Sequence, residues 1–112
     1  MGDPVTFVDD FELLNAHIGV ARAFDNRVGT FAAIEALRLA AAGRSKLRCA
    51  IYACASVQEE TGCNGAAMNV VNVKPDAAIA IDVTHATDSP GIDVKEHGEV
   101  KLGAGPTVSV GR

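Results

Sequence analysis

The chain has 112 residues, of which 48% are apolar, and its net charge is −4 at pH 7. These values suit a single packed domain, or part of one, and they exclude a disordered chain. Basic residues stand singly, no apolar run reaches the roughly 18 residues of a membrane span, and no secretory leader is visible. The three cysteines, an odd number, fit a reducing compartment. We therefore expect a cytoplasmic protein that binds neither nucleic acid nor membranes.

The first part of the chain predicts two short strands and a long helix. Residues 4–8 and 18–24 are short apolar runs that favour strands. Residues 28–42 are rich in Ala and Leu with a thin polar stripe, which predicts a largely buried helix. Asp25 and Asn26 stand between the second strand and this helix, where helix-capping residues belong.

The second part of the chain continues the alternation. Residues 47–57 are apolar nearly throughout, which is typical of a strand covered on both faces. Residues 65–73 favour a helix, and residues 77–81 are a second buried strand that runs directly into Asp82. The remaining expected elements are a loop and two short strands, at 84–96, 99–102 and 107–110.

This order of elements predicts an α/β fold, with a mixed sheet sandwiched between helices. Functional sites in such sheets lie at the carboxyl ends of the strands. Acidic residues occupy those ends: Asp25 follows one strand, Glu59 and Glu60 follow the next, and Asp82 follows the third. Carboxylates that converge on one edge repel each other unless cations lie among them. The pattern therefore favours a metal site over a set of solvated loop residues.

Three ordered segments resemble the M42 family of metallo-aminopeptidases, which includes tetrahedral, glutamyl-type and deblocking aminopeptidases. These segments are residues 23–29 (AFDNRVG), 57–62 (VQEETG) and 80–84 (AIDVT). Gly65-Ala66 and residues 102–106 fit the same pattern, so the resemblance covers essentially the whole chain. It implies a zinc-peptidase-like α/β/α domain in an enzyme that removes N-terminal amino acids from peptides.

The resemblance also implies a role for each acidic residue. Two divalent ions, zinc or cobalt, would share the carboxylate of Asp25, while Glu60 binds one ion and Asp82 the other. Asn26 would follow a cis peptide bond, and Glu59 would be the general base that takes a proton from the attacking water. Peptide substrates and a homo-oligomeric full-length protein follow from the same resemblance.

The chain departs from the family at its histidines. The family's site also uses two histidine ligands, and His17, His85 and His97 stand in neither of the corresponding motifs. The resemblance implies that residues 16–112 are part of the catalytic domain, and that residues 1–15 are the exit strand of an inserted dimerisation domain. We therefore expect a truncated segment with little activity on its own.

Two alternatives remain open. The chain could be a non-catalytic metal-binding or interaction module of the same fold, although its four acidic residues are all in place. It could also be a glycoside hydrolase that uses Glu59 and another carboxylate as acid and base. With one Tyr and no Trp, the chain has little aromatic surface on which sugars could stack. The sequence leaves open the preferred N-terminal residue of the substrate and the physiological metal.

Overall fold

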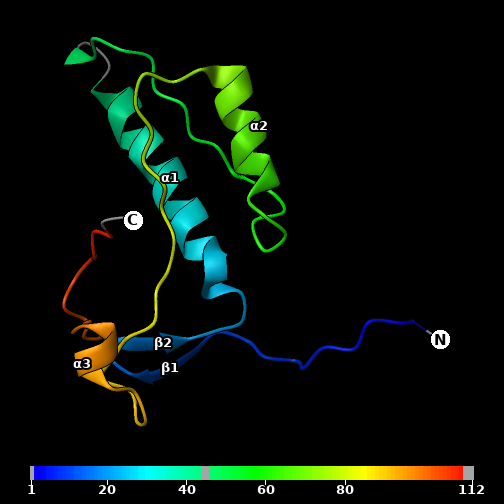
Figure 1. Ribbon diagram of the computed structural model, residues 1–112, viewed down its shortest axis with the longest axis vertical. Helices are drawn as coiled ribbons and strands as arrows, with labels where there is room; N and C mark the ends of the chain where they lie inside the picture. Colours follow the sequence, from blue (N-terminus) through cyan, green and yellow to red (C-terminus); the bar gives the residue numbers. More distant parts are fainter. Residues whose placement is uncertain (1, 44–45, 110–112) are drawn as a thin grey trace.

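The computed structural model describes residues 2–43 and 46–109, and it contains three helices and one two-stranded hairpin within those ranges (Figure 1). The elements in chain order are β1 (Glu12–Asn15), β2 (Ile18–Val20), α1 (Phe24–Ala42), α2 (Asn64–Val73) and α3 (Val94–His97). The segment from residue 47 to residue 57 runs between α1 and α2 in an extended path (Figure 1). This arrangement is compatible with part of an α/β domain, and the described residues do not form a complete helix–sheet–helix sandwich.

The hairpin is antiparallel, with Glu12 opposite Val20 and an irregular register before Asn15. The Asn15 side chain closes its turn, because Oδ1 accepts hydrogen bonds from the backbone N–H groups of His17 at 2.8 Å and Ile18 at 3.0 Å. A side-chain oxygen that bonds the backbone two or three residues further on is the usual turn chemistry of Asn. Of the strand predicted at 18–24, only its first three residues are therefore paired.

The strands predicted at 47–57 and 77–81 are wrong for the described part of the chain, where both segments lack a strand partner. The physical reason is that a strand satisfies its backbone groups only through a neighbouring strand, whereas a helix satisfies them internally. The same correction applies to 4–8, 99–102 and the described part of 107–110, whose last residue lies outside the described residues.

The two long helices are confirmed. The predicted helix 28–42 lies within α1, and the predicted helix 65–73 lies within α2. Asp25 and Asn26 have non-helical backbone angles, so the regular part of α1 begins at Arg27.

The predicted loop 84–96 is interrupted by α3. Its first turn is capped by Asp93, whose carboxylate accepts a hydrogen bond from the backbone N–H of Lys95 at 2.8 Å. Glu96 stands three residues after Asp93, which is the spacing of a capping box. This spacing is the sequence signal that the loop prediction overlooked.

Apolar side chains are exposed throughout the described ranges, and none of them is buried. Val5 and Val8 are each 93% exposed, and Ile79 in the second predicted buried strand is 89% exposed. Exposed apolar area of this extent is typical of interaction surfaces and of surfaces that aggregate. None of the described helices combines the length and the apolar character that crossing a membrane requires.

We expect the 112-residue chain, expressed alone, to self-associate or to be poorly soluble. The exposed faces of residues 47–57 and 77–81 offer both unpaired backbone groups and apolar side chains, which favour edge-to-edge pairing. Light scattering after size-exclusion chromatography, together with binding of a hydrophobic dye, measures this directly. A monodisperse monomer that binds no dye and melts in one sharp two-state transition would contradict the expectation.

Candidate active site

Asp25 lies where the chain passes from the hairpin into α1. Ala23 adopts the left-handed conformation, with φ at 59°, and turns the chain just before this point. The peptide bond between Asp25 and Asn26 is cis, as the family resemblance implied. The Asp25 carboxylate is exposed, so it is free to meet a ligand at this junction.

Asn26 links the start of α1 to the segment that carries Asp82. Its Nδ2 donates a hydrogen bond to the carbonyl oxygen of Ile81 at 3.0 Å, across 55 positions of sequence. Because Asp82 directly follows Ile81 and Asp25 directly precedes Asn26, this one bond brings together the backbone segments that carry two of the predicted ligands. The Asp82 side chain is exposed, and its Oδ1 accepts a hydrogen bond from the backbone N–H of Val83 at 2.8 Å.

Glu59 and Glu60 lie in a tight turn that leads into α2. The carbonyl oxygen of Glu59 accepts hydrogen bonds from the N–H groups of Gly62 at 3.0 Å and Cys63 at 2.9 Å. Gln58 starts this turn in the left-handed conformation, with φ at 58°. Both glutamate side chains are exposed, and the thiol of Cys63 lies 3.8 Å from Oε1 of Glu59.

The start of α2 is in direct backbone contact with the segment that precedes the turn. The N–H of Gly65 donates to the carbonyl oxygen of Val57 at 3.0 Å, and Nδ2 of Asn69 donates to Oγ of Ser56 at 3.1 Å. A Cβ at position 65 would lie 2.5 Å from both the backbone nitrogen and the backbone oxygen of Val57. The close approach of the two backbones therefore requires glycine at this position.

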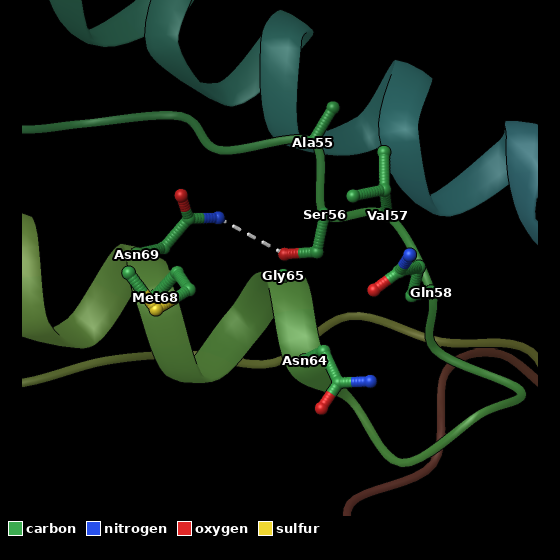
Figure 2. A pocket seen from close by; sticks show the side chains of 8 residues that line it. All are labelled: Ala55, Ser56, Val57, Gln58, Asn64, Gly65, Met68 and Asn69. Carbon is green, nitrogen blue, oxygen red and sulfur yellow. Dashed lines mark hydrogen bonds between the residues drawn. The ribbon is translucent and has the colours of Figure 1, made fainter.

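A shallow hollow of about 270 Å³ lies between α2 and the extended segment (Figure 2). Ala55 and Val57 point towards α1 in this view, whereas Ser56 points towards α2. Alternation of this kind is the side-chain pattern of a strand, although the segment has no strand partner. The hollow is lined by Ala55, Ser56, Val57, Gln58, Asn64, Gly65, Met68 and Asn69.

The four predicted acidic residues do not form one metal-binding group. No three His, Cys, Asp or Glu side chains within residues 2–43 and 46–109 lie close enough together to hold an ion. Carboxylate oxygens at the junction of Asp25 and Asp82 are donors that suit a divalent cation. The described residues therefore offer carboxylate donors of the kind that a metal ion binds, while a complete ligand set is not assembled among them.

The histidines do not complete the set. His17 lies in the turn of the hairpin, His97 ends α3, and His85 lies three residues after Asp82. All three side chains are exposed, and the described part of the chain contains no cluster that includes them. The boundary predicted between residues 15 and 16 falls in the turn of the β1–β2 hairpin, and it stays a prediction.

Sequence reasoning missed the contribution of Gly29, which is buried. Its N–H donates to Oδ1 of Asn26 at 2.7 Å. A donor three residues after the capping side chain is the geometry of a helix N-cap. The Asn-x-x-Gly spacing was therefore the signal that could have identified this pair.

Comparison with known proteins gives the same family along the whole chain. The family model described as M42 glutamyl aminopeptidase matches residues 1–112. A candidate aminopeptidase from Acetivibrio thermocellus is 37% identical over 111 residues, which are 98% of this chain and 31% of the relative. Lysyl aminopeptidase from Pyrococcus furiosus is 34% identical over 107 residues, which are 94% of this chain and 28% of the relative.

A third relative is glutamyl aminopeptidase from Lactococcus lactis, which is 34% identical over 80 residues, or 71% of this chain and 22% of the relative. No solved structure matches the chain. The chain spans less than a third of the length of each of these three relatives, at 31%, 28% and 22%. Because the family model matches every residue from 1 to 112, and these three relatives are 37%, 34% and 34% identical over 98%, 94% and 71% of this chain, the chain belongs to the M42 peptidase family.

Proposed function

We propose that this chain is a segment of the catalytic domain of a metal-dependent aminopeptidase, which removes amino acids from the N-termini of peptides. Membership of the family and the aminopeptidase names of the relatives support this proposal. The observation that carries it is the hydrogen bond from Asn26 to Ile81, which joins the segments bearing Asp25 and Asp82. The bond brings together the backbone segments that carry Asp25 and Asp82, and exposed carboxylates on neighbouring segments are oxygen donors of the kind that divalent cations bind.

In this proposal Asp25, Glu60 and Asp82 would hold two divalent ions, zinc or cobalt. When bound, such ions polarise the carbonyl that is cleaved and make water a stronger acid. Glu59 accepts a proton from the attacking water and returns it to the nitrogen of the departing amine. Glu59 and Glu60 are consecutive residues of the turn from Gln58 to Cys63, and in this proposal the first would accept the proton while the second would be a metal ligand. The described residues do not assemble a complete ligand set, so in this proposal the remaining ligands come from other residues.

A specific observation favours a second candidate, a non-catalytic metal-binding or interaction module. The four carboxylates form no cluster of three within the described residues, so those residues make at most part of a metal site. In that case the protein encoded by the longest reading frame that includes this chain would bind divalent ions weakly and hydrolyse no peptide bond.

The test measures which substrates are hydrolysed, and with which metal, by the protein encoded by the longest reading frame that includes this chain. The purified protein is stripped with a chelator, and hydrolysis of lysyl and glutamyl amides is measured before and after addition of cobalt. We expect cleavage only of the amides with a free α-amine, loss of activity on chelation and recovery with cobalt. An N-acetylated amide is the matched control, and carboxymethyl cellulose tests the glycoside hydrolase alternative. Cleavage of cellulose, or amide hydrolysis that chelation leaves unchanged, would refute the proposal.

A further inference from the structure

We propose that Asn26 is a positioning residue, whose side-chain amide holds Asp82 in register with Asp25, and that Gly29 is needed to make room for this amide. The inference rests on the proposed metal-dependent function, and it assigns the Asn26 side chain a task separate from metal binding. The task is to connect two segments that lie 55 positions apart in the sequence.

The amide of Asn26 is fixed in one orientation by its two partners. Oδ1 accepts a hydrogen bond from the N–H of Gly29, which can only donate, and Nδ2 donates to the carbonyl of Ile81, which can only accept. Rotation of the amide by half a turn would place two donors together at one end and two acceptors together at the other. Only one arrangement of the junction satisfies both hydrogen bonds of the half-buried Asn26 amide, so these bonds stabilise that arrangement over others.

The backbone carbonyl of Asn26 is anchored as well. Oγ1 of Thr30 donates to the carbonyl oxygen of Asn26 at 3.1 Å, one helical turn further on. Movement of Asn26 therefore requires movement of the first turn of α1. Because Asp25 is bonded directly to Asn26, the position of its carboxylate follows the position of this turn.

Gly29 leaves the space that the amide occupies. A Cβ at position 29 would lie 2.3 Å from Oδ1 and 2.7 Å from Nδ2 of Asn26, whereas real Cβ contacts essentially never fall below 3.0 Å. The atoms in conflict belong to the end of a movable side chain, so the backbone of α1 can stay in place while the amide is displaced. Gly29→Ala should therefore remove the bond to Ile81 without unfolding the helix.

Gly43, which follows the last residue of α1, provides the matched control. A Cβ there would lie 3.8 Å from its nearest neighbour, the carbonyl oxygen of Ala40, which is an ordinary contact. Gly43 has φ at −99°, which any residue can adopt. Gly43→Ala thus adds the same methyl group at the opposite end of α1 without touching Asn26.

The experiment measures cobalt affinity by titration calorimetry, in the protein encoded by the longest reading frame that includes this chain. The variants are Asn26→Ala, Gly29→Ala, their double mutant and Gly43→Ala. We expect each of the first two to weaken cobalt binding roughly 10- to 100-fold, as loss of groups that orient metal ligands does. At saturating cobalt, kcat should return close to that of the wild type, because no ligand has been removed.

The double mutant distinguishes positioning from general damage. Once the amide is absent, the methyl group at position 29 has nothing to displace, so the double mutant should bind cobalt no more weakly than Asn26→Ala alone. Multiplication of the two losses would show that they act independently, and it would overturn the inference. Circular dichroism melting checks that every variant is folded. If Asn26→Ala does not fold, the comparison of Gly29→Ala with Gly43→Ala still tests the inference.

Hydrogen exchange at the backbone N–H of Val83 provides a readout that needs no metal. This N–H is bonded to Oδ1 of Asp82, so its exchange should accelerate in Asn26→Ala and Gly29→Ala but not in Gly43→Ala. If the wild type binds cobalt and all variants match it, the inference is wrong and the proposed function stands. If the wild type neither binds cobalt nor hydrolyses amides, the proposed function fails, and unchanged exchange at Val83 would then overturn the inference separately.

Discussion

Replacement of Glu59 by glutamine is expected to lower kcat by roughly two to four orders of magnitude, which is the usual contribution of general acid–base catalysis. Glutamine keeps the size and hydrogen-bonding capacity of the side chain but cannot accept the proton. Metal content should stay near that of the wild type, because Glu59 is proposed to act on water and not as a ligand. Steady-state kinetics and elemental analysis of the same sample give both values.

The neighbouring substitution Glu60→Gln should give the opposite result. It replaces a charged metal ligand by a neutral one, so metal should be lost first, and activity should partly return at high added metal. Glu12→Gln, in the exposed strand β1, is the control that changes neither value. If Glu59→Gln loses an ion while Glu60→Gln retains both, the two roles are exchanged. If neither variant differs from the wild type, the pair is a solvated turn.

Replacement of Gly65 by alanine is expected to destabilise the protein by roughly 1–3 kcal/mol, the range for forcing extra atoms into a filled space. The added Cβ would lie 2.5 Å from two backbone atoms of Val57, and backbone cannot rotate away as a side chain can. The turn that holds Glu59 and Glu60 lies between these contact points, so kcat should fall together with stability. Urea denaturation and the amide assay measure the two effects.

Gly43→Ala is the matched control for this prediction. Its φ of −99° suits alanine, and such replacements stabilise by about 0.4–1 kcal/mol because they restrict the unfolded chain. A Gly65→Ala protein with the urea midpoint of the wild type would mean that α2 and the segment at Val57 do not approach as closely as 2.5 Å implies.

The sequence was sufficient to predict the helices, because helices are specified by local interactions. The Ala- and Leu-rich run at 28–42 and the run at 65–73 both form helices within a residue or a few of the predicted bounds. The capping role expected of the Asp25-Asn26 step is confirmed for Asn26, which bonds the N–H of Gly29. Each of these features depends on residues fewer than five positions apart.

The strands could not be predicted in the same way, because their stability depends on partners far away in the sequence. Residues 47–57 keep the alternation of a strand at Ala55 to Val57, yet no neighbouring strand pairs with them among the described residues (Figure 2). The convergence of acidic residues was inferred from strand ends, and it stays a prediction. The Asn26 link joins the segments of Asp25 and Asp82, whereas no group of three ligands forms in the described ranges.

The most direct test of the account is to locate the metal ions. Crystals of the protein from the longest reading frame that encodes this chain would be soaked in cobalt, and anomalous diffraction would be collected at the cobalt edge. We expect two peaks roughly 3.5–4 Å apart, the spacing of two-metal sites. Asp25 should contact both, Glu60 one and Asp82 the other, with Glu59 contacting neither. Cobalt bound elsewhere, with Asp25 and Asp82 free of any ion, would contradict the account.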